Sequence, residues 1–442
     1  MFNYASYCKR FSFVIIFFLL ISCFSIKSNK YVLAADKDLQ QELDNNIENI
    51  LDKTDFSSLD DSVYSVPELN LSFRDFVKTI LNGEQSLDYN VLISKIKDVF
   101  FKQIKDNLRF FVILFIVIFL YEIFKSFANS KYIELNSSLK IIFSFLLSTT
   151  ILFLVKDFYK EISLLIDDLF SFVTILFPIL ISLLTLSGAV KSAAVFGSFS
   201  VFLLETGAYV IKFVLLPLAL SILFLSLFGS VFLKGSFSKL TSLFKQIFKY
   251  VIVLFFAVFG LVSTVNVIST TTHDGINLKL TKFALKNYIP VLGGYVSEGF
   301  DFIYSCSVLI KNAVGVCSIV IIVFKILFPL IVVIVLSLGF RVLSVVTGFV
   351  GDKTFSNMFE DVSNAFSNFL TIILGLFLIC FVFIFLIILS VGVVWNAWVS
   401  NLYYFFKFTF WVFAVGLSIK KIIWNCQVVF FTNYYLFSLL KN

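Results

Sequence analysis

Apolar runs of roughly twenty residues follow one another from residue 108 to residue 394. An α-helix rises 1.5 Å per residue, so about 20 apolar residues cross the ~30 Å hydrocarbon core of a bilayer. Only 14% of the 442 residues are charged, and these cannot cover the surface of a soluble protein of this length. The sequence therefore predicts an all-α, polytopic helical membrane protein.

Nine spans are expected in residues 108–394, with a charge pattern in their connections that predicts the topology. The expected spans are 108–124, 139–155, 169–190, 192–211, 213–233, 250–268, 302–324, 326–346 and 369–394. The connections 125–140 and 234–249 are rich in lysine, which predicts that they face the cytoplasm. The connections 156–168 and 347–368 carry more acids than lysines, which predicts that they lie outside.

The N-terminus has the pattern of an export signal. Two basic residues precede the apolar run 11–26, and a small-residue cleavage site ends near Ala34. Residues 1–34 are therefore predicted to be a signal peptide. Two alternatives stay open: Cys23 fits a bacterial lipoprotein signal, and the apolar run also fits an uncleaved anchor helix.

An acidic segment follows, and residues 35–107 are predicted to form a small helical extracytoplasmic region. Residues 36–94 hold 13 of the 28 acidic residues but only four basic ones. One stretch has an apolar residue at every fourth position, which indicates an amphipathic helix: Leu39, Leu43, Ile47 and Leu51. This helix either packs on the membrane domain or a partner, or stays solvated. Such segregated charge is not typical of a nucleic-acid-binding protein.

Patterns that carry common catalytic or metal chemistry are missing from the sequence. The chain has no Walker lysine loop, no GxSxG elbow and no HExxH pair, and its one histidine is His273. The six cysteines form no CxxC pair. We therefore expect no catalytic residue, no cofactor and no metal.

Ionisable side chains inside apolar runs are the candidates for function. A charge at mid-membrane costs at least ~3 kcal/mol on insertion scales, so it usually faces a partner, a pore or water. Glu205 and Arg341 lie toward span ends, where a buried pair or an interfacial position is expected. Lys311 lies centrally beside Asn312, and no acid lies one turn away on its own helix. Its partner must then lie on another helix, on another subunit or in water, and both a structural and a functional role stay open.

Prolines and glycines mark the expected distortions of the helices. Loop 269–301 is predicted to hold an interfacial helix that Pro290 and Gly293-Gly294 break. Three expected spans contain a proline, which predicts kinks: Pro178, Pro217 and Pro329.

Two short stretches resemble one known family. Residues 286–294, Lys-Asn-Tyr-Ile-Pro-Val-Leu-Gly-Gly, followed by Ser297, Glu298 and Asp301, resemble the signature stretch of the stage III sporulation protein AE family of endospore-forming bacteria. Residues 309–315, Leu-Ile-Lys-Asn-Ala-Val-Gly, are also similar to that family. The order of signal peptide, acidic leader and multispan body matches as well, so the resemblance covers roughly residues 1–392.

The resemblance implies a function that composition does not. Members of this family belong to a multi-protein mother-cell assembly that, with a forespore partner, is expected to form a channel across the two membranes around the developing spore. The implied partners are the other stage III sporulation A-operon proteins, the forespore channel partner and the lipid bilayer, without nucleic acid. The implied location is the mother-cell-derived outer forespore membrane. The motif positions Lys311, Asn312, Pro290, Gly293 and Gly294 are candidates for packing or the conduit.

The end of the chain departs from the family, and one rival function stays open. Residues 395–442 hold all four tryptophans and are expected to be an atypical apolar tail without an assigned function. The rival is a stand-alone multispan transporter that uses Lys311 and Glu205 as substrate or proton sites. An internal repeat of the span pattern would favour that rival, and the sequence shows none.

Overall fold

The computed structural model describes residues 37–64, 72–82, 89–127, 133–229, 239–260, 283, 293–350 and 353–390. The expected signal peptide, the tail from residue 395 and Pro290 lie outside these residues. The elements are α2 (Lys37–Lys53), α3 (Ser57–Tyr64), α4 (Phe73–Leu81), α5 (Tyr89–Phe127), α6 (Ile133–Leu186), α7 (Val190–Tyr209), the π-helical η1 (Val210–Leu215), α8 (Leu216–Gly229), the helix Lys239–Gly260, α10 (Gly293–Val350) and α11 (Lys353–Leu389). These ranges contain no strand, so the all-α prediction is confirmed.

Six helical stretches within the described ranges are long and apolar enough to cross a membrane, where nine spans were expected. The expected spans 139–155 and 169–190 both lie in α6, and 302–324 and 326–346 both lie in α10. The described parts of 192–211 and 213–233 lie in one continuous helical stretch, Val190–Gly229. The charged segment 156–168 stays helical because it contains no Gly, Pro or Asn to form a turn. With 54 and 58 residues, α6 and α10 are about 81 and about 87 Å long, more than twice the thickness of a hydrocarbon core.

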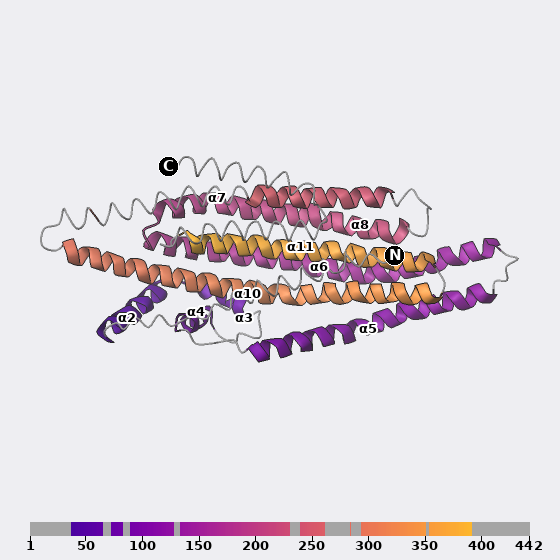
Figure 1. Cartoon of the computed structure of the whole chain (residues 1–442), viewed down its shortest axis with the longest axis horizontal. Coiled ribbons are helices and arrows are strands. Elements are labelled where there is room, and N and C mark those ends of the chain that lie inside the picture. The colour runs from indigo at the N-terminus through magenta and orange to yellow at the C-terminus, as the bar shows by residue number, and fades with distance from the viewer. Residues whose placement is uncertain are drawn as a thin grey trace, which may run out of the picture. The chain divides into compact units, whose positions relative to one another are not determined.

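The long helices run side by side in alternating directions (Figure 1). At one end of this bundle the Tyr121 ring contacts the rings of both Phe143 and Phe355, and Lys140 donates a hydrogen bond to Thr354. The start of α11 therefore lies beside the end of α5 and the beginning of α6. Residues 125–140 and 347–368 were predicted to lie on opposite sides of the membrane, but the hydrogen bond between Lys140 and Thr354 joins these two segments at the same end of the bundle.

The short helices α2, α3 and α4 pack on the long ones. Their apolar side chains are buried, among them Leu51, Leu59 and Phe76, and helices α2 and α4 contact α10. Of the two arrangements left open for the amphipathic helix, packing on the chain's own bundle is the one observed. At the surface, Lys78 Nζ donates to Glu48 Oε1 at 2.8 Å, and this bond lowers the pKa of the Glu48 carboxyl.

The three prolines inside expected spans have different consequences. Pro217 follows η1, where the Leu216 N–H donates to the Ile211 carbonyl five residues back. Proline has no N–H and its ring crowds the carbonyl four residues before it, and the wider π turn relieves that crowding. Helices α6 and α10 continue through Pro178 and Pro329.

Candidate functional site

Helices α10 and α11 form an antiparallel hairpin whose register is fixed by paired serines. Ser337 and Ser363 each donate to the other's carbonyl, at 3.2 and 2.8 Å, and Ser344 and Ser356 do the same at 2.9 and 2.8 Å. The two pairs are seven residues apart on each helix, which is the repeat of a left-handed helix pair, and the small side chains allow close approach. Between them, Arg341 Nη1 donates to Glu360 Oε1 at 2.8 Å, and this pair is only partly buried because the two side chains are 26% and 46% exposed.

Lys311 lies at the other end of the same hairpin. Its side chain is 0% exposed, and Nζ donates to the Ile388 carbonyl at 2.8 Å and to the Ile387 carbonyl at 3.1 Å. These carbonyls belong to the last turn of α11, where carbonyls generally lack an intrahelical donor, although the Ile387 carbonyl also accepts the Ser390 N–H at 3.3 Å. The carboxyl end of a helix also carries partial negative charge, which favours an amine there. Lys311 therefore caps α11 from the neighbouring helix.

Gly315, one turn after Lys311, lets the end of α11 come close. A Cβ atom at this glycine would lie 2.5 Å from both Cδ1 and Cγ1 of Ile388, closer than atoms can approach. Ile388 thus has two roles: its side chain packs against Gly315, and its carbonyl accepts the hydrogen bond from Lys311. Beside them, the Oδ1 atom of Asn312 is buried and accepts no hydrogen bond from the described residues.

The other predicted site residues are not gathered around Lys311. Glu205 is exposed on α7, on one helical face with the exposed Phe202 and Tyr209. Within the described part of the chain, neither a hydrogen bond nor an ion pair joins Glu205 to Lys311. Gly293 and Gly294 are the first two residues of α10, and the residues just before them lie outside the described ranges.

Two ion pairs cross the middle of the bundle, and sequence reasoning did not find them. Lys325 Nζ lies 2.8 Å from Asp168 Oδ2 and links α10 to α6, while Lys212 Nζ lies 2.6 Å from Asp167 Oδ1 and links η1 to α6. The Lys325 side chain is only 5% exposed, whereas the Lys212 side chain is 30% exposed. The sequence does contain a signal for such ion pairs, namely a single lysine within an apolar run together with acidic residues in another helix.

Asp168→Asn is expected to lower the free energy of unfolding by about 2 kcal/mol, because it leaves the buried Lys325 ammonium without its carboxylate. A fully buried broken pair costs about 3–5 kcal/mol, and the half-exposed Asp168 reduces this. Asp167→Asn is the matched control, since its partner Lys212 is more exposed, and should cost less than about 1 kcal/mol. Thermal unfolding in detergent measures both, and equal losses would contradict the assignment.

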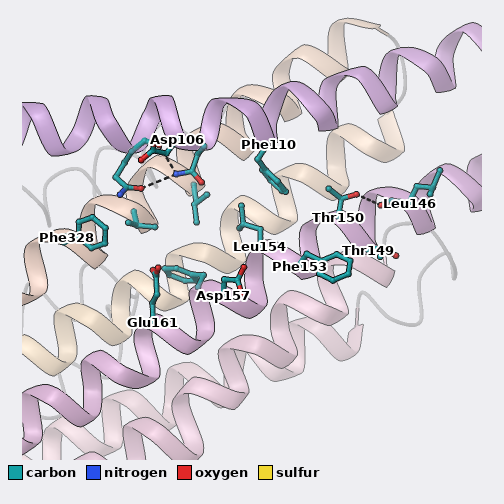
Figure 2. Close-up of a pocket in the computed structure, with 15 residues that line it drawn as sticks. Asp106, Phe110, Leu146, Thr149, Thr150, Phe153, Leu154, Asp157, Glu161 and Phe328 are labelled. Atoms are coloured by element: carbon teal, nitrogen blue, oxygen red, sulfur yellow. Dashed lines mark hydrogen bonds between the residues drawn. The ribbon is translucent and has the colours of Figure 1, made fainter.

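A pocket of about 550 Å³ lies between α5, α6 and α10 (Figure 2). Acidic groups from two helices line it, Asp106 from α5 and Asp157 with Glu161 from α6. Its other walls are mainly apolar, with four phenylalanines among the lining residues: Phe110, Phe153, Phe158 and Phe328. Sequence reasoning missed this pocket because residues 156–168 were expected to be a connecting loop. Their pattern of acids four residues apart is the signal that a helical interpretation would have used.

The comparisons with known proteins agree with one another. A family model described as Stage III sporulation protein AE matches residues 71–392. The Stage III sporulation protein AE of Bacillus subtilis (strain 168) is 31% identical to this chain over 204 residues, which are 46% of this chain and 51% of that protein. The match thus spans about half the length of this curated relative. No solved structure matches the chain.

Proposed function

Because the chain belongs to the stage III sporulation protein AE family, we propose that it is a membrane subunit of a sporulation channel complex between mother cell and forespore. The observation that carries this proposal is the family match over residues 71–392, which includes all six of the described helical stretches able to cross a membrane. The role is proposed to be structural or conducting rather than catalytic. The proposed partners are the other proteins of its operon and a forespore partner, at the outer forespore membrane.

The geometry around Lys311 favours a subunit over a stand-alone transporter. A transporter that used Lys311 and Glu205 together would need both at one site. The Lys311 amine instead binds two backbone carbonyls inside the bundle, and Glu205 lies exposed on another helix. An acid on an exposed apolar helix face in the membrane needs a polar neighbour, which another subunit would supply.

Deletion of the gene in its host is the test of this role. We expect normal engulfment of the forespore, followed by loss of late forespore gene expression and of heat-resistant spores. A tagged copy should restore both, lie around the forespore and purify together with the products of neighbouring genes. Normal spore counts after deletion would contradict the proposal. A tagged protein that purifies alone and transports a solute in vesicles would support the transporter.

A further inference from the structure

One side of the helix Lys239–Gly260 carries polar and basic side chains, here called the basic stripe. Its members recur at three- and four-residue intervals and therefore share one helical face: Lys239, Ser242, Lys245, Gln246 and Lys249. One described acid lies beside the stripe, Asp361 of α11, whose Oδ1 atom is 3.8 Å from Lys245 Nζ and thus beyond hydrogen-bonding distance. In the described part of the chain, the ammonium groups of Lys239 and Lys249 form neither a hydrogen bond nor an ion pair. Three lysines against one acid leave the stripe with net positive charge.

The basic stripe lies at the lysine-rich end of the bundle. Lys140 donates to Thr354 and Lys245 lies beside Asp361, so the segments 125–140 and 234–249 both meet the first three turns of α11. These segments contain three and four lysines, against one glutamate in the first and no acid in the second. An excess of lysine is typical of the cytoplasmic side of a membrane, where the leaflet carries anionic lipids. The contacts with α11 therefore bring both segments to the end where an anionic leaflet is expected.

An exposed apolar stripe runs along the same helix, directly beside the basic stripe. Its side chains are 39–67% exposed and recur at four, three and four residues: Leu243, Ile247, Tyr250 and Leu254. From the first to the last of them the helix rises about 16 Å, which is about the depth of the hydrocarbon in one leaflet. The helix thus presents positive charge and, next to it, an apolar surface as long as one leaflet is deep.

This combination matches an amphiphile with an anionic headgroup. Lys245 and Lys249 are one turn apart, so their ammonium groups can bind the same phosphate, and the exposed Gln246 adds an N–H donor. We propose that this surface binds one anionic phospholipid, with its phosphate on these two lysines and an acyl chain along the apolar stripe. A zwitterionic headgroup would bring a cation to the lysines, and inorganic phosphate would make no apolar contact. This site goes beyond the proposed channel role and does not depend on it.

The test titrates the full chain in detergent with phosphatidylglycerol or with phosphatidylcholine of the same acyl chains, and native mass spectrometry counts the bound lipids. We expect one phosphatidylglycerol to bind more tightly than phosphatidylcholine. Lys245→Gln and Lys249→Gln should each weaken phosphatidylglycerol binding about fivefold, the factor that one lysine contributes at an anionic membrane surface, and leave phosphatidylcholine binding unchanged. Lys53→Gln removes the same charge from an exposed site on α2 and should bind as the unmodified chain does. Thermal unfolding without added lipid checks that each variant is folded, and Lys249→Gln removes no ion pair of the described residues.

Several results would overturn the proposal. Equal affinity for the two lipids, or an equal loss in Lys53→Gln, would show that only the net charge of the chain matters. Displacement of phosphatidylglycerol by an equal concentration of inorganic phosphate would show an anion site without a lipid contact. Binding of a polyglutamate peptide without binding of phosphatidylglycerol would also overturn it, because the basic stripe would then be a docking site for an acidic protein segment.

Discussion

Lys311→Met is expected to lower the free energy of unfolding by about 3 kcal/mol and to reduce the amount of protein in the cell. Methionine fills a similar volume but donates no hydrogen bond. The Ile387 carbonyl keeps the Ser390 hydroxyl as a donor at 2.7 Å, whereas the Ile388 carbonyl loses the donor it has in the structure. Hydrogen bonds from a charged group contribute about 1.5–3 kcal/mol, and an unsatisfied buried carbonyl costs a similar amount.

Three measurements on one set of strains separate the possible roles of Lys311: protein level, co-purification of the complex, and sporulation efficiency. Lys353→Met is the matched control, since Lys353 is exposed at the start of α11. Lys311→Arg keeps a charged donor and should retain more function than Lys311→Met, although arginine is larger and planar. Normal protein level and complex recovery in Lys311→Met, with failed sporulation, would show that Lys311 acts in the conduit rather than as a cap.

The fold class was predictable because the membrane requires it. Backbone groups in hydrocarbon must be satisfied within the segment, so long apolar runs imply helices. The number of helices was not predictable from hydropathy alone. Charged stretches such as 156–168 have the composition of a loop, but they also contain good helix formers and neither glycine nor proline. Ion pairs to neighbouring helices, such as Lys325 with Asp168, compensate part of the charge within continuous helices.

The candidate site was predictable in part. A central lysine without an acid on its own helix must find its partner elsewhere, and Lys311 does so on another helix. The identity of that partner has no signature in the sequence, because the carbonyls at a helix end are backbone groups that every residue has. The four-residue spacing of Asp157 and Glu161 could be seen in the sequence. That Asp106 of α5 lines the same pocket could not, because this depends on how α5 packs against α6.

Gly315→Leu is expected to be as damaging as the loss of the lysine, about 3 kcal/mol, which is the upper end for overpacking. The new side chain must displace Ile388, because even a Cβ atom would lie 2.5 Å from its Cδ1 and Cγ1 atoms. Since Ile388 also provides the carbonyl that Lys311 binds at 2.8 Å, this displacement weakens the cap as well. Packing and hydrogen bonding at this end of the hairpin should therefore fail together.

A double-mutant cycle tests this mechanism by thermal unfolding in detergent. Shortening the opposing side chain with Ile388→Ala should remove more than half of the cost of Gly315→Leu, because residues in contact are not additive. Gly299→Leu is the matched control on the same helix: a Cβ there meets no atom within 4 Å, and leucine favours a helix over glycine, so stability should stay equal or rise. If Ile388→Ala gives no rescue, the clash between Gly315→Leu and Ile388 is not the cause of the loss, and the cap and the glycine act independently.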